Sequence, residues 1–91
     1  ADYDHPRTAI LMAHARGVIL LVGQRAGLEV IHLPATEVKK AVTGYGHASK
    51  EQMQRAVMAQ CHLAELPTPP DVADAIAIAL TCARRRALER L

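Results

Sequence analysis

Residues 70–79 read Pro-Asp-Val-Ala-Asp-Ala-Ile-Ala-Ile-Ala and open an Ala-rich segment whose periodicity predicts a final helix from Asp71 to Arg90. Asp71 and Asp74 are three residues apart, so a helix places both carboxylates on one face near its start. Such a pair can share a divalent metal ion. Alternatively, Asp71 caps the helix and Asp74 complements the helix dipole, since acids are common at helix starts.

The upstream sequence predicts three more helices, which span Arg7 to Gln24, Thr36 to Thr43, and Ser49 to about Glu65. The first is apolar nearly all round, so it must be covered on more than one side. Gly44 favours a left-handed cap after the second helix. Ser49 and Gln52 match a capping box, in which the two residues satisfy each other's free backbone amides. Prolines 67, 69 and 70 predict a stiff, extended connector before the final helix.

The segment from Leu28 to Leu33 is β-branched and is bounded by Gly27 and Pro34, which predicts a short strand. The sequence offers this strand no partner. We therefore predict a mainly helical chain with one short strand, in which residues 1–91 form part of one domain. A helix, a strand and further helices are what remain when an α/β domain lacks its leading strands.

Composition restricts the classes of function. The formal net charge is +2, and the chain has no Trp or Phe, so it offers no platform for stacking single-stranded bases. Cys61 and Cys82 are far apart without a CxxC spacing, which indicates two reduced thiols in a cytoplasmic protein. The apolar run from Ala9 to Val22 is interrupted by His14 and Arg16 and is shorter than the ~20 residues that a bilayer requires, so we expect no membrane span.

Five blocks of sequence carry a resemblance to a known family. The pattern DxxDAxAxA in residues 71–79 resembles the end of RuvC-type Holliday junction resolvases. Four upstream blocks also match, in family order and with family-like spacing: residues 15–18 (ARGV), 37–40 (EVKK), 42–46 (VTGYG) and 48–50 (ASK). Each block alone is weak, but together they cover nearly the whole chain.

This resemblance implies an α/β ribonuclease H-like fold, a homodimer or swapped self-association, and a branch-migration helicase as partner. It implies cleavage of four-way junction DNA with two Mg²⁺ ions, in which Asp71 and Asp74 are catalytic metal ligands. Lys39 and Lys50 match lysines that lie near the scissile DNA, although both could simply be solvated. Tyr45 and His47 could reach DNA from the Gly-rich turn that they share, and Tyr45 could equally pack over the turn.

The chain departs from the family pattern at its start. The family's first-strand aspartate and later-strand glutamate are missing, and the glutamate would lie only a few residues before Ala1. We therefore expect the C-terminal portion of a single resolvase domain, inactive alone. The alternative is a non-catalytic helical module that self-associates or binds DNA. For the basic run 84–86, a solvated helix end and a DNA-binding stripe remain open.

Overall fold

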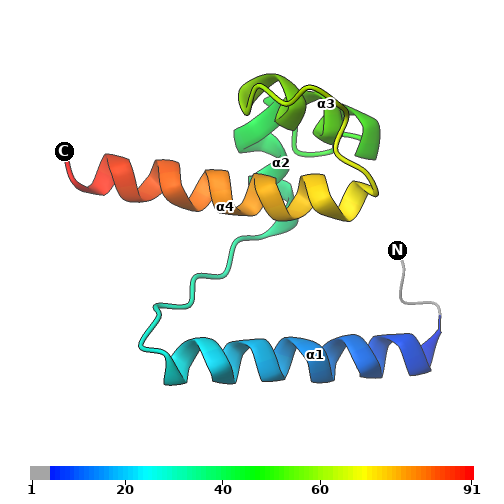
Figure 1. Cartoon of the computed structure of the whole chain (residues 1–91), viewed down its shortest axis with the longest axis vertical. Coiled ribbons are helices and arrows are strands. Elements are labelled where there is room, and N and C mark those ends of the chain that lie inside the picture. Colours follow the sequence, from blue (N-terminus) through cyan, green and yellow to red (C-terminus); the bar gives the residue numbers. More distant parts are fainter. Residues whose placement is uncertain (1–4) are drawn as a thin grey trace. The chain divides into compact units, whose positions relative to one another are not determined.

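The computed structural model describes residues 5–91, which divide after Ile31 into two compact units. Within these residues lie four helices: α1 (Pro6–Arg25), α2 (Ala35–Thr43), α3 (Lys50–Gln60) and α4 (Pro70–Glu89) (Figure 1). The first unit holds α1, and the second holds α2, α3 and α4. The prediction of a mainly helical chain is therefore confirmed.

The predicted strand from Leu28 to Leu33 is wrong. Residues 28–34 have no regular secondary structure, and no strand occurs between residues 5 and 91. The physical reason is that a strand needs a neighbour to pair with its backbone N–H and C=O groups, and no other described segment supplies one. The described residues therefore contain helices and no part of a sheet.

Helix α1 is the least covered element. Pro6 occupies its first turn, as the rules of helix initiation favour, yet no residue of the helix is buried. Its exposed large apolar side chains are Ile10, Leu11, Met12, Val18, Ile19, Leu21 and Val22. No helix in the described part of the chain is long and apolar enough to cross a membrane.

The hydrophobic core belongs to the second unit, where α2, α3 and α4 pack against one another. It consists of seven buried residues: Val38, Val42, Ala48, Met53, Val57, Ala73 and Ala77. In each helix the buried residues recur at intervals of four, the spacing that keeps side chains on one face. The small side chains of Ala73 and Ala77 let the neighbouring helices approach α4 closely. As Figure 1 shows, α2 and α3 lie over the first half of α4, and the C-terminal end of α4 projects beyond them.

Local capping signals fix the C-terminal end of α2 and the start of α3. The C-cap Gly44 has φ 86°, in the left-handed region that the sequence predicted. The capping box at the start of α3 is also confirmed, because Ser49 N donates to Gln52 Oε1 at 2.7 Å and Gln52 N donates to Ser49 Oγ at 3.1 Å.

Helix α3 ends at Gln60, about five residues before the predicted end. His62 adopts a left-handed φ of 54°, and Leu63 N donates to Met58 O at 2.9 Å, which closes the helix end. The prediction ran too far because glycine usually supplies this conformation, and the sequence has histidine there. Histidine is one of the few other residues that adopt it with some frequency.

The basic run 84–86 makes intramolecular contacts. Arg84 donates to Gln60 Oε1 at 2.9 Å, Arg85 pairs with Glu37 at 3.0 Å, and Arg86 lies 3.5 Å from Glu89. Arg84 and Arg85 therefore connect the second half of α4 to α3 and α2. This role was not among the two interpretations that the sequence offered.

The packing of Val57 provides a test of the core. We expect Val57→Ala to lower the free energy of unfolding by about 2 kcal/mol, because the fully buried side chain loses two methyl groups and leaves a cavity. Val72→Ala on α4 is the matched control, since Val72 is 41% exposed and should lose about 0.5 kcal/mol or less. Urea denaturation of both variants would measure the difference, and equal losses would contradict the packing described.

Candidate functional site

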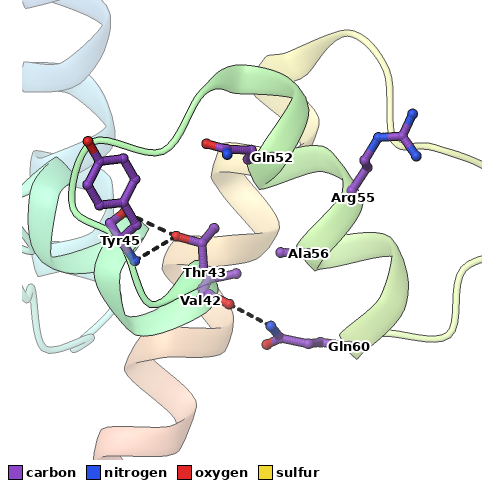
Figure 2. Close-up of a pocket in the computed structure, with 7 residues that line it drawn as sticks. All are labelled: Val42, Thr43, Tyr45, Gln52, Arg55, Ala56 and Gln60. Atoms are coloured by element: carbon purple, nitrogen blue, oxygen red, sulfur yellow. Dashed lines mark hydrogen bonds between the residues drawn. The ribbon is translucent and has the colours of Figure 1, made fainter.

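The turn between α2 and α3 carries two of the four predicted DNA-binding residues, Tyr45 and His47, and the hydroxyl of Thr43 organises it. Thr43 Oγ1 lies 2.7 Å from Lys39 O in the preceding turn of α2, to which it can donate. It also accepts from Tyr45 N at 3.0 Å, as Figure 2 shows. Together with the left-handed Gly44, these bonds fix the turn to the end of α2. The buried Ala48 then leads into the cap of α3.

The four predicted DNA-binding side chains lie in this turn or on the two helices that flank it. Tyr45 is 57% exposed, and its ring meets the ring of His47 edge-on, with centroids 5.7 Å apart. Lys50 is the exposed first residue of α3, and Lys39 is half-buried on α2. The tyrosine therefore does not lie buried over the turn, and its hydroxyl-bearing ring and the imidazole are accessible together.

An open groove of about 440 Å³ lies beside the turn, between α2 and α3 (Figure 2). Val42 and Ala56 form its apolar part, while Tyr45 and Gln52 lie toward the α2–α3 turn. Arg55 also borders the groove, but its guanidinium points away from the other lining residues and pairs with Glu51 at 2.8 Å.

Asp71 and Asp74 lie at the start of α4, outside its buried face. Asp71 is the second residue of the helix and Asp74 is the fifth, and both are exposed. The helix begins one residue earlier than predicted, with Pro69 as N-cap and no side-chain cap bond, so Asp71 does not cap it. Within residues 5–91 neither carboxylate forms a hydrogen bond or an ion pair. Both carboxylates are free to bind a ligand.

Two carboxylates suit a hard divalent cation by donor chemistry but are too few to enclose one. Mg²⁺ prefers oxygen ligands in octahedral geometry and usually keeps several waters. Across the described residues, no three His, Cys, Asp or Glu side chains are grouped closely enough to hold a metal ion. Asp71 and Asp74 would therefore suit a divalent cation only together with further ligands.

Among the described residues, no hydrogen bond or ion pair links Asp71 or Asp74 to the turn between α2 and α3. Both groups nevertheless belong to the same packed unit, because α2 and α4 share the core through Val38, Val42 and Ala73.

Comparison with known proteins decides the family. Residues 3–82 match the model of the family described as crossover junction endodeoxyribonuclease RuvC. The chain belongs to the RuvC family. The match includes the turn between α2 and α3 and both Asp71 and Asp74. It ends at residue 82, before the arginines at 84–86.

Two curated RuvC relatives show the extent of the likeness. The crossover junction endodeoxyribonuclease RuvC of Rhodopirellula baltica is 58% identical over 80 residues, which are 88% of this chain and 45% of the relative. That of Heliobacterium modesticaldum is 51% identical over 76 residues, which are 84% of this chain and 47% of the relative. The chain thus spans about half the length of the curated relatives that it matches. No solved structure matches it.

Sequence reasoning missed two glutamines that hold this RuvC chain together. Gln54 Nε2 donates to Pro67 O at 2.9 Å, and Gln60 Nε2 donates to Val42 O at 2.6 Å. Their partners lie 13 and 18 residues away, so no local pattern could have identified them. The one signal for Gln54 was its place beside Met53 on the predicted apolar face of α3.

Proposed function

We propose that this chain is the C-terminal part of a Holliday junction resolvase domain and supplies two of its catalytic carboxylates and part of its DNA-binding surface. The observation that carries the proposal is the RuvC family match together with the exposed, unpaired pair of Asp71 and Asp74 on α4. The relatives are named for cleavage of crossover junctions, and the corresponding substrate is four-way junction DNA in recombination and repair. A branch-migration helicase would be a partner of the complete protein.

The chemistry of the proposed reaction is hydrolysis of a phosphodiester with Mg²⁺. When bound, divalent ions would supply an activated water and stabilise charge on the leaving oxygen. The role of Asp71 and Asp74 is to present oxygen ligands from a rigid helix. Lys39 and Lys50 would hold phosphates of the DNA backbone as compact charges, with Tyr45 and His47 beside them. Because the other carboxylates are missing here, we propose that residues 1–91 alone cleave far more slowly than a complete resolvase.

The aspartates are tested in a chimera in which this chain replaces the matching part of the Rhodopirellula baltica relative. We expect Asp71→Asn and Asp74→Asn each to slow Mg²⁺-dependent junction cleavage by about two orders of magnitude or more, because an amide is a poorer magnesium ligand than a carboxylate. Junction binding and thermal stability should stay near the parental values. Glu89→Gln, in the last turn of α4, is the matched control. Near-parental cleavage by both asparagine variants would show that Asp71 and Asp74 are not catalytic metal ligands and only stabilise the helix.

The lysines are tested by the salt dependence of junction binding. We expect Lys39→Ala and Lys50→Ala each to weaken binding and to reduce the slope of log K against log salt by about 1, because each phosphate contact releases about one counterion. Lys40→Ala is the matched control, since Lys40 is exposed and adjoins Lys39 on the same helix. A slope that changes equally in all three variants would indicate general charge attraction instead of placed contacts.

A second candidate function, a non-catalytic module that self-associates, is favoured by α1. Seven large apolar side chains of this helix are exposed, more than a soluble monomer of this size ordinarily leaves uncovered. A homodimer or a swapped pair would cover them. Self-association is also compatible with the resolvase proposal, so junction cleavage by the chimera separates the two.

We expect sedimentation of the chain at micromolar concentration to show a dimer that Ile19→Glu dissociates, because a charge would be buried in the apolar contact. Ile78→Glu on the exposed face of α4 is the control and should leave the dimer intact. A compact monomer, or a dimer that only Ile78→Glu disrupts, would contradict self-association through α1.

A further inference from the structure

Gln54 is a polar residue in the core of the second unit. It is only 8% exposed. On α3 it directly follows the buried Met53 and lies three residues before the fully buried Val57. Burying an amide without hydrogen bonds is costly, so its partner is informative. The side-chain Nε2 donates to Pro67 O at 2.9 Å, and no buried side-chain nitrogen or oxygen of the described residues lacks a partner.

Pro67 belongs to the connector that leads from α3 into α4. Three of the four residues from Pro67 to Pro70 are prolines, whose φ angles are fixed by the ring. A restraint on the carbonyl of Pro67 is therefore transmitted through a stiff segment to Pro70, the first residue of α4, and to Asp71 directly after it.

The start of α4 has few other restraints. Residues 70–72 are not buried, and the N-cap Pro69 makes no side-chain cap bond. The core holds α4 only from Ala73 onward, through Ala73, Ala77 and Thr81. Ahead of Ala73, the side-chain hydrogen bond that holds the connector within residues 5–91 is the bond from Gln54 to Pro67 O.

We propose that Gln54 is a positioning residue for the carboxylates of Asp71 and Asp74, acting through the carbonyl of Pro67. The inference rests on the proposed function for its consequence in cleavage, but its structural part can be tested without any nuclease activity. Gln54 would touch neither metal nor DNA. Its role is to keep the first turn of α4 in one place so that both carboxylates are presented together.

The test compares two glutamines of the same helix that make the same kind of bond. Gln54→Met keeps the length of the side chain and removes the donor to Pro67. Gln60→Met removes an equivalent donor, which binds Val42 O at the far end of α3 and not the connector. Both variants lose one amide-to-carbonyl bond, and Gln60→Met also removes the acceptor of Arg84, so a general loss of stability should affect Gln60→Met at least as strongly.

Hydrogen exchange of the 91-residue chain is the first readout. We expect Gln54→Met to lower the protection factors of the amides of Val72, Ala73 and Asp74 by about tenfold, the factor that one hydrogen bond gives, whereas Gln60→Met leaves them unchanged. Equal protection in the two variants at these amides would overturn the proposal.

Gln54→Glu keeps the proposal testable if the methionine variant does not fold. It preserves the shape of the side chain, and the glutamic acid can donate to Pro67 O again once it is protonated. We expect protection at the start of α4 to be low near neutral pH and to recover on acidification. Protection that does not change with pH would overturn the role of the donor.

The second readout is cleavage by the chimera with the Rhodopirellula baltica relative. Gln54→Met should raise the Mg²⁺ concentration for half-maximal cleavage by about tenfold without changing junction binding, and Gln60→Met should not. An unchanged magnesium requirement despite lost protection would overturn the link from Gln54 to the carboxylates. The aspartate variants, measured separately, decide whether the carboxylates act in cleavage at all.

Discussion

The close approach of α4 to α2 and α3 over two fully buried alanines is the contact on which the second unit depends. Ala73 and Ala77 have no exposed surface, and their short side chains let Val38, Val42 and Val57 fill the space between the helices. A core this small contributes a modest hydrophobic stabilisation, so helix ends must be satisfied by other means. The capping box at Ser49 and the left-handed Gly44 do this locally.

Polar contacts set the position of α4 along this alanine face. Near its start, Gln54 holds the carbonyl of Pro67, and farther along, Arg84 binds Gln60, which in turn donates to Val42 O. Apolar contacts between small side chains are less directional than hydrogen bonds. Hydrogen bonds at both ends favour one placement. This placement matters because the carboxylates of Asp71 and Asp74 project from the first turns of α4.

Features that depend on residues within one helical turn could be predicted from the sequence, whereas features that depend on distant residues could not. The cap at Ser49 and the stop at Gly44 involve residues within one turn, and both were predicted correctly. The strand at Leu28 to Leu33 was wrong because β-branched composition favours a strand only when a neighbour pairs with it. The end of α3 and the roles of Gln54 and Arg85 depend on a rare histidine conformation and on distant partners.

The position of the aspartates followed from spacing, but their freedom did not. Spacing predicted that Asp71 and Asp74 share a face, whereas the start of α4 at Pro70 decides that Asp71 is not used as a cap. A carboxylate that satisfies no backbone amide keeps its oxygens available to a cation. The positive end of the helix dipole, however, stabilises the carboxylates themselves and repels a cation. Two acids in this position would therefore bind magnesium weakly alone, and a tight site requires further carboxylates whose charge outweighs the dipole.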